Sequence, residues 1–249
     1  MRATAWSEDR PGFFRLTVAD TNCYLVRTAD GATLVDAGLP ATGRALDALL
    51  RHLGMRRTDI DAVILTHGHF DHVGMARSLH AADVPVLVHE RDQRLARHPY
   101  SYRPARARVP YLISHPGGIP VIGRMALAGA LAVRGVAARA DAVDGVRVDA
   151  PGRPMTIHTP GHTDGHCAYV FPDAGVLVSG DALVTLDPYT GRRGPQIVAD
   201  AATSDAGVAL RSLERLAETG ADLVLPGHGE PWSGGISRAV ASALRVGRH

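Results

Sequence analysis

Residues 65–74 read LTHGHFDHVG and place three histidines and one aspartate within six consecutive positions. Imidazole nitrogens and carboxylate oxygens are common ligands of zinc and similar divalent metals in proteins. Four such groups, buried together without a partner, would repel one another or lose the hydrogen bonds that water supplies. A bound metal therefore explains why the chain concentrates them here. The candidate ligands in this segment are His67, His69, Asp71 and His72.

Three later segments offer further ligands of the same kinds. A site that holds two metals needs roughly six or seven ligands, more than the first segment supplies. Each later candidate has glycine as its neighbour, within TPGHTDGH, SGDAL and PGHGEP. Glycine adopts positive φ values readily and lets the backbone approach a crowded site. The additional candidates are His162, Asp181 and His228.

Predicted strands lead directly into these polar clusters. Residues 61–67, DAVILTH, form a short apolar run that predicts a buried strand ending at the first cluster. Residues 222–231, DLVLPGHGEP, repeat this arrangement at the last one. Residues 22–28 and 32–38 predict a β-hairpin with its turn at residues 29–31.

Helical patterns alternate with the strands. Residues 41–53 carry apolar residues at helical spacing, and the amphipathic pattern that begins at residue 209 predicts a helix that ends at Gly220. Further strands are predicted around residues 154–159, 166–171 and 175–181, which gives the chain two β-rich halves. Alternation of this kind is typical of a layered α/β or α+β domain.

Five short motifs occur in a fixed order along the chain: VDAG, THGHFDH, TPGHT, GDAL and PGHG. Together they resemble the motif series of the metallo-β-lactamase superfamily, and they extend from Asp36 to His228. The resemblance implies an αββα sandwich, in which two mixed β-sheets pack face to face with helices outside and a metal site lies along one edge. This α/β (α+β) fold agrees with the two β-rich halves.

The resemblance also implies a role for each candidate ligand. Two divalent ions, zinc foremost and iron or manganese as alternatives, would share a hydroxide that attacks the substrate. Asp36 would lie behind the ligands and orient one of them. Asp71 could also accept a proton during turnover, which would make it a catalytic residue. One metal would be bound by His67, His69 and His162, and the other by Asp71, His72 and His228, with Asp181 bridging both.

The substrate is less constrained than the metal site, because one fold hosts many reactions. Glyoxalase II-like thioesterases and lactonases share an aspartate at the position of Asp181, so we expect a hydrolase of an ester, thioester or lactone bond. True β-lactam hydrolases usually carry cysteine or serine there. The alternatives are a mononuclear iron persulfide dioxygenase and a metal-binding protein without turnover. The complete ligand set argues against the second alternative.

Residues 97–140 depart from the alternating pattern and predict a lid or insertion within a single domain, residues 1–249. The arginines in this segment either face solvent or contact an anionic substrate group. Residues 119–138 are apolar and could cover the metal edge, which would favour a hydrophobic acyl group on the substrate. A core helix and a homodimer contact are the other interpretations. Further substrate contacts are predicted at Tyr189, Arg192 and Arg193.

Composition excludes several classes of function. The formal net charge is only +2, so we expect a small-molecule substrate and no nucleic-acid partner. Arg124 and Arg134 interrupt the apolar residues 119–138 and argue against a membrane span. Residues 1–15 lack the long apolar region of an export signal. Since two cysteines cannot form a disulfide framework, we expect a cytoplasmic protein.

Overall fold

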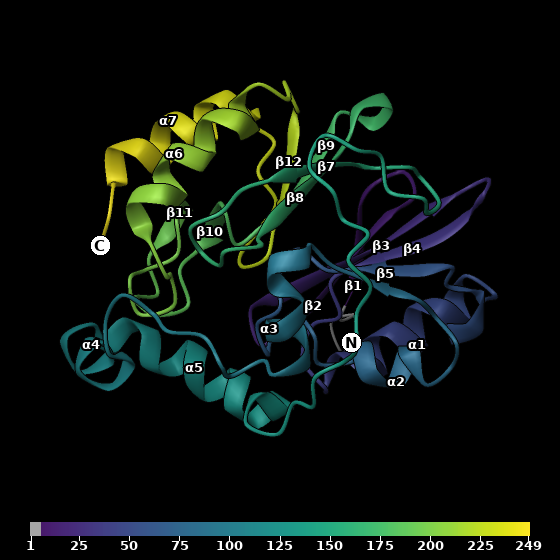
Figure 1. The fold of residues 1–249 in the computed structure, drawn as a ribbon, viewed down its shortest axis with the longest axis horizontal. Helices are drawn as coiled ribbons and strands as arrows, with labels where there is room; N and C mark the ends of the chain where they lie inside the picture. Colours follow the sequence, from purple (N-terminus) through teal and green to yellow (C-terminus); the bar gives the residue numbers. More distant parts are fainter. Residues whose placement is uncertain (1–5) are drawn as a thin grey trace.

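A six-stranded sheet forms the first half of the structure, which is a computed structural model describing residues 6–249 (Figure 1). Residues 1–5, on which part of the expectation about an export signal rests, lie outside the described residues. Strands β4, β5 and β6 run parallel, so β4 and β5 end at the same sheet edge. In sheet order the strands are β1 (Trp6–Arg10), β2 (Phe13–Val18), β3 (Thr21–Thr28), β4 (Gly31–Val35), β5 (Ala62–Ile64) and β6 (Val86–Leu87).

The predicted hairpin is confirmed as the antiparallel pair β3 and β4. Tyr24 lies opposite Val35, and Thr28 lies opposite Gly31 at the turn. Because β4 ends at Val35, the polar residue that follows it emerges beside the residues that follow β5. The register of the hairpin thus brings the first two motifs together.

A four-stranded sheet forms the second half. Strands β9 and β12 are parallel neighbours, so the residues that follow both strands emerge at one edge. In sheet order the strands are β12 (Leu223–Pro226), β9 (Val176–Gly180), β8 (Cys167–Phe171) and β7 (Met155–His158). A separate antiparallel pair consists of β10 (Val184–Leu186) and β11 (Arg193–Gln196).

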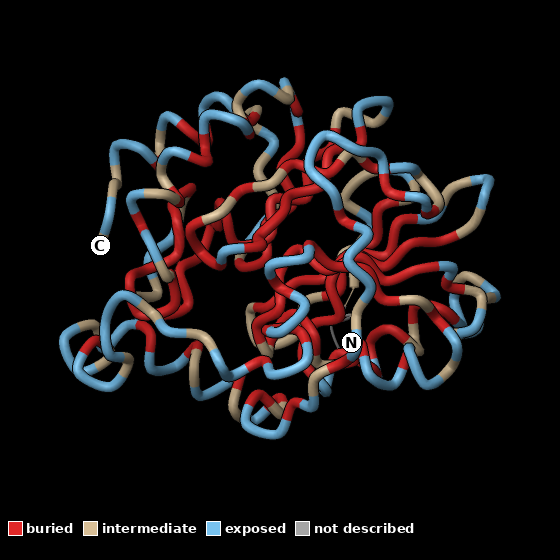
Figure 2. The backbone as a smooth tube through the Cα atoms, in the orientation of Figure 1, coloured by how far each residue is buried: buried red, intermediate tan, exposed pale blue. Residues whose placement is uncertain are grey.

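Helices cover the outer faces of both sheets and complete the αββα sandwich (Figure 1). In α1, Leu46, Leu49 and Leu50 lie on one face and are buried against the first sheet. Apolar residues pack in three layers, one between the sheets and one beneath the helices on each side, and Figure 2 shows this buried interior. The covering helices are α1 (Thr42–His52) and α2 (Ala76–His80) on the first sheet, and α6 (Ala206–Ala217) and α7 (Ile236–Val246) on the second.

The segment 97–140 contains two short helices and a π-helical turn instead of one long apolar helix. The helical part ends at Ala130, where Gly129 has a φ of 97° that a continuing helix does not allow. Leu127 and Leu131 are 92% and 82% exposed, so the homodimer contact stays a prediction. The elements here are α3 (Gln93–Arg97), which leads into the segment, α4 (Arg108–Ser114), α5 (Ile119–Met125) and the turn η4 (Ala126–Ala130).

Short 3₁₀ helices occupy several connections: η1 (Arg57–Asp59), η2 (Glu90–Asp92), η3 (Pro116–Gly118) and η5 (Pro172–Ala174). None of the helices among residues 6–249 combines the length and the apolar character that a bilayer crossing requires. Both cysteines, Cys23 and Cys167, are buried as free thiols.

Two tyrosine hydroxyls cross between the sheets in opposite directions. Tyr24 in β3 donates to the carbonyl oxygen of Pro226 at the end of β12, at 2.7 Å. Tyr169 in β8 donates to the carbonyl oxygen of Leu65, which follows β5, at 2.8 Å. Each bond therefore fixes the backbone immediately before a histidine loop of the other sheet.

These bonds give a testable difference between two matched substitutions. We expect Tyr169→Phe to lower the free energy of unfolding by about 1 to 2 kcal/mol, because it removes the donor to a buried carbonyl oxygen. Tyr24→Phe should cost less, since Asn22 Nδ2 also donates to the Pro226 carbonyl oxygen, at 2.9 Å. Urea denaturation followed by circular dichroism measures both. An equal or larger loss in Tyr24→Phe would contradict this account.

Candidate metal centre

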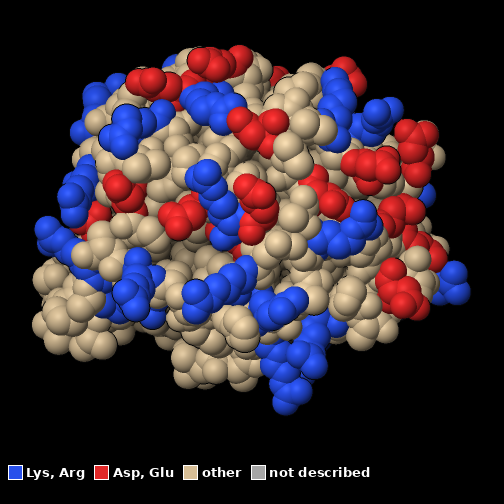
Figure 3. Space-filling view, in the orientation of Figure 1, with Lys and Arg blue, Asp and Glu red and all other residues tan. Residues whose placement is uncertain are grey.

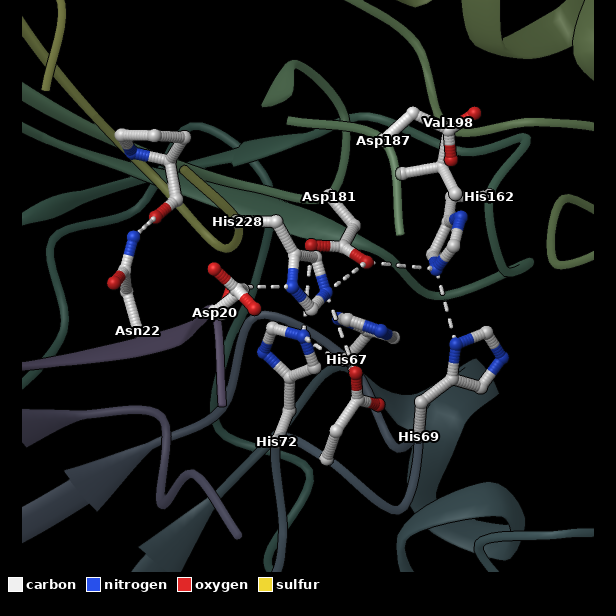
Figure 4. Close-up of polar contacts among 12 residues, drawn as sticks. Asp20, Asn22, His67, His69, His72, His162, Asp181, Asp187, Val198 and His228 are labelled. Carbon is white, nitrogen blue, oxygen red and sulfur yellow. Dashed lines mark hydrogen bonds and ion pairs between the residues drawn. The ribbon is translucent and has the colours of Figure 1, made fainter. Parts of the chain in front are cut away.

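The structure brings all seven predicted ligand residues to one edge of the sandwich, where the two sheets meet. The loop after β5 carries four of them, and the others follow β7, β9 and β12. Their side chains converge (Figure 4) and are between 0 and 6% exposed. Within each of three groups, the possible ligand atoms lie within 4.8 Å of one another. These groups are His67, His69 and His162; His67, His72 and Asp181; and Asp71, His72 and His228.

Four buried polar atoms at this edge have no hydrogen-bond partner. They are Nε2 of His67, His69 and His72, and Oδ1 of Asp181. A buried polar atom without a partner is costly and rare in folded proteins. Divalent metals are bound in proteins by imidazole nitrogens and carboxylate oxygens, which are the atom types left unpartnered here. The residues present therefore fit divalent cations.

Asp36 fixes two of the histidines from behind. Its Oδ2 accepts hydrogen bonds from His72 Nδ1 at 2.9 Å and from the Thr66 hydroxyl at 2.8 Å. Since that hydroxyl donates to Asp36, it accepts the proton of His67 Nδ1, 3.0 Å away. Both rings therefore direct Nε2 into the site. The predicted orienting role of Asp36 agrees with these contacts.

The backbone at Asp36 explains why this residue type suits the position. Its φ is 61°, a left-handed conformation that Asp and Asn adopt more easily than most other residues. Asp36 Oδ1 also accepts from the Thr66 backbone N–H at 2.7 Å. One residue thus makes the turn after β4 and holds the start of the histidine loop.

The remaining histidines are oriented in a similar way. His228 Nδ1 is 2.9 Å from the carbonyl oxygen of Asp20, and His162 Nδ1 is 3.2 Å from the Thr203 hydroxyl. His162 Nε2 lies 3.0 Å from His69 Nδ1. In Figure 4, His162 lies between Asp181 and His69. Two of these rings are thus held through Nδ1, which directs Nε2 inwards.

Burial and mutual charge set the protonation of the group. Burial lowers the pKa of His162 to about 4. Burial alone would also lower the pKa of His72, but the carboxylates of Asp36 and Asp181 raise it to about 9. Burial disfavours the ionised form of Asp181, yet His228 and His72 hold its pKa well below the ordinary value. The carboxylates that favour a proton on His72 would equally favour a divalent cation.

Close backbone packing determines where Asp181 lies. The backbone N–H of Asp181 donates to Nε2 of the buried His166, at 3.0 Å. Gly227 lies so close that an added Cβ would be 2.2 Å from Asp181 Oδ1 and 2.9 Å from His72 Cε1. Position 227 therefore requires glycine, because any side chain there would collide with Asp181 and His72.

A small cavity of about 20 Å³ lies against the cluster. Tyr189, a predicted substrate contact, lines it, whereas the other two predicted contacts, Arg192 before β11 and Arg193 at its start, are exposed and are not among its lining residues. Tyr102 lines it too, and its ring centroid is 3.7 Å from that of His69. The apolar lining residues are Phe70, Ile122, Met125, Pro188, Val198 and Ala202.

Glycines join the segment 97–140 to the residues beside this cavity. A Cβ at Gly117 or Gly118 would lie 2.5 and 2.0 Å from the carbonyl oxygens of Thr190 and Tyr189 respectively. The segment therefore packs directly on the residues that follow β10.

Sequence reasoning did not identify Tyr102 as part of the site. His166 occurs in the same TPGHTDGH segment as His162, and that position indicates a contact behind the ligands or with substrate as one possible role without deciding for it. His158, at the other end of that loop, is half-buried and stacks on His89 with ring centroids 4.4 Å apart. Tyr102 has no motif around it, because its contact with His69 depends on how a distant segment folds back.

Comparisons with known proteins agree with this geometry. The family model described as the metallo-beta-lactamase superfamily matches residues 16–228. The probable metallo-hydrolase YflN of Bacillus subtilis (strain 168) is 30% identical over 263 residues, covering 98% of this chain and 94% of the relative. The similarity therefore extends well beyond the histidine motifs.

Solved structures give the same result. A metallo-beta-lactamase family protein from Thermus thermophilus is 29% identical with a TM-score of 0.68, covering 93% of this chain and 78% of that chain. The structure of TTHA1623 in a di-iron-bound form is 28% identical with a TM-score of 0.60, covering 88% and 92%. Both similarities extend over most of this chain.

The contact at Gly227 gives a prediction about this edge. Gly227→Ala should displace Asp181 and reduce the divalent metal that the purified protein retains after dialysis. Gly123→Ala is the matched control, because nothing lies within 4 Å of a Cβ at Gly123. Elemental analysis of both variants measures the effect. Equal metal retention in the two variants would show that crowding at Gly227 does not matter for the site.

Proposed function

This chain belongs to the metallo-beta-lactamase superfamily, and on that premise we propose that it is a metal-dependent hydrolase with a two-metal centre. The bond cleaved is an ester, thioester or lactone. The observation that carries the proposal is the set of unpartnered buried ligand atoms, Nε2 of His67 and His72 and Oδ1 of Asp181, with His69 Nδ1 facing His162 Nε2 beside them. These atoms need cations to be satisfied.

The contacts of Asp181 support its assignment as the ligand shared by both metals. Its Oδ2 lies 3.3 Å from His162 Nε2 and 3.4 Å from His228 Nε2. Its Oδ1 lies 3.5 Å from His72 Nε2. The carboxylate thus faces members of both proposed ligand sets, the first with His67, His69 and His162, and the second with Asp71, His72 and His228.

Zinc is the metal we propose first, because histidine and carboxylate ligands suit it. Iron is the second candidate, since TTHA1623 has been solved in a di-iron-bound form. When bound, two such ions supply a Lewis acid for the scissile carbonyl group and lower the pKa of a coordinated water.

The chain's own residues would orient the substrate and move a proton. Asp71 Oδ2 lies 3.3 Å from His228 Nε2, which places a carboxylate at the cavity that can accept and pass on a proton. The apolar lining, which includes Phe70, Ile122 and Met125, would pack against an acyl group once the cavity, now about 20 Å³, has opened. We therefore propose that the segment 97–140 acts as a lid over a small acyl substrate.

The test combines metal analysis with a substrate panel. We expect about two divalent ions per chain, and chelator-sensitive cleavage of at least one of a 4-nitrophenyl ester, a thioester and a lactone. Asp181→Ala should lose at least one ion and about tenfold to a hundredfold of the activity or more. The exposed Asp173→Ala is the control, which should keep both.

Three results would overturn parts of this proposal. Unchanged metal content and activity in Asp181→Ala would defeat the shared-ligand assignment. A single iron per chain without hydrolysis would favour a persulfide dioxygenase. Two metals without turnover of any panel substrate would favour a metal-binding protein that does not catalyse a reaction.

A further inference from the structure

Arg108, the first residue of α4, is half-buried, and two of its three guanidinium nitrogens lie in the interior without an acceptor. Its Nε and Nη2 atoms are buried and have no hydrogen-bond partner among the described residues. A guanidinium group has five N–H donors and stays charged at all physiological pH values. Because burial of an unpaired charge is costly, such a group is suited to an anionic ligand.

Tyr102 connects this guanidinium group to the metal centre. The central carbon of the Arg108 guanidinium lies 4.3 Å from the centroid of the Tyr102 ring. The His69 ring lies 3.7 Å from the same centroid. Two groups at these distances cannot share one face of the ring, so Tyr102 lies between Arg108 and His69. The charge is therefore one aromatic ring away from a proposed metal ligand.

Further arginines line a neighbouring hollow, which Tyr102 borders, although Arg108 itself lines neither this hollow nor the metal-site cavity. The hollow of about 310 Å³ shares Tyr102 with the metal-site cavity, and it is lined by Arg91, Arg94 and Arg103. None of these three arginines forms an ion pair with another residue of the described range 6–249. Figure 3 shows basic side chains gathered over α3 and the neighbouring part of the segment 97–140.

Acidic residues do not cancel this charge. Asp92 lines the hollow, but its Oδ2 accepts from the Gly68 N–H and the Thr163 hydroxyl, and its Oδ1 accepts from the Gly165 N–H. Asp164 is the other acidic residue that lines the hollow. Three guanidinium groups therefore line the hollow with only two carboxylates. The Asp92 carboxylate already accepts two backbone N–H groups and one hydroxyl, which leaves Asp164 as the carboxylate without these hydrogen bonds.

We propose that Arg108 binds an anionic group of the substrate, a carboxylate or a phosphate, beside the metal centre. The substrate would then be an ester or thioester that carries a negative charge close to its scissile bond. A planar guanidinium binds either group through two parallel hydrogen bonds, which lysine cannot reproduce. This proposal rests on the hydrolase function proposed above and names its substrate class.

The experiment compares two esters of equal acyl length that differ in charge. The metal-loaded wild type, Arg108→Met, Arg108→Lys and the control Arg97→Met are assayed with 4-nitrophenyl hydrogen succinate and 4-nitrophenyl butyrate. Arg97 is an exposed arginine of α3, whereas Arg108 has two buried guanidinium nitrogens and stacks on Tyr102. Succinate and inorganic phosphate are titrated separately by calorimetry into the same proteins, which tells a carboxylate site from a phosphate site.

We expect the ratio of kcat/KM for the succinate ester to that for the butyrate ester to fall about tenfold to a hundredfold in Arg108→Met. Arg108→Lys should fall less, and Arg97→Met should match the wild type. One of the two anions should bind the wild type measurably more tightly than it binds Arg108→Met.

An unchanged ratio, even with lower activity on both esters, would overturn the proposal and leave Arg108 a structural residue that stacks on Tyr102. Equal anion binding by the wild type and Arg108→Met would overturn it as well. If the wild type cleaves neither ester, the failure concerns the hydrolase function with these esters, and calorimetry alone decides whether Arg108 binds an anion.

Discussion

Seven ionisable side chains, each almost fully buried, share one edge of this protein, and they cannot satisfy one another. Five are histidines whose rings face two carboxylates across distances of a few ångströms. Folding removes water from all of them at once. Bound cations would offset the free-energy cost of this desolvation. The surrounding structure is best understood as the support that this arrangement needs.

The support comes from both halves of the sandwich. Parallel strands deliver Asp36 and Thr66 to one place on the first sheet, and they deliver Asp181 and His228 to one place on the second. Tyr24 and Tyr169 then hold each sheet to the backbone of the other. The distance between the two ligand sets is therefore fixed by sheet packing as well as by the loops themselves.

The sequence allowed the motif-bearing loops, the hairpin and the amphipathic helix α6 to be predicted, because each depends on neighbouring residues or on a short repeat. The helix α7 and the first strands β1 and β2 were not predicted. The apolar helix expected over residues 119–138 stops at Ala130, since Gly129 adopts a positive φ. Tyr102 could not be identified from sequence, and the sequence left open whether arginines such as Arg108 face solvent or contact an anion, because the contacts of both residues cross a folded loop. Local patterns thus predicted the ligands, and long-range packing determined their surroundings.

The cavity at the metal centre has a kinetic consequence. At about 20 Å³ it has room for one water molecule and none for an ester. If the segment 97–140 is the lid proposed above, substrate would reach the site when this segment separates from Tyr189 and Thr190, against which Gly117 and Gly118 are packed. Opening and closing of such loops commonly takes microseconds to milliseconds and can limit turnover. The strength of the backbone contact at these two glycines would then set how often the site opens, and with it the upper limit of the turnover rate.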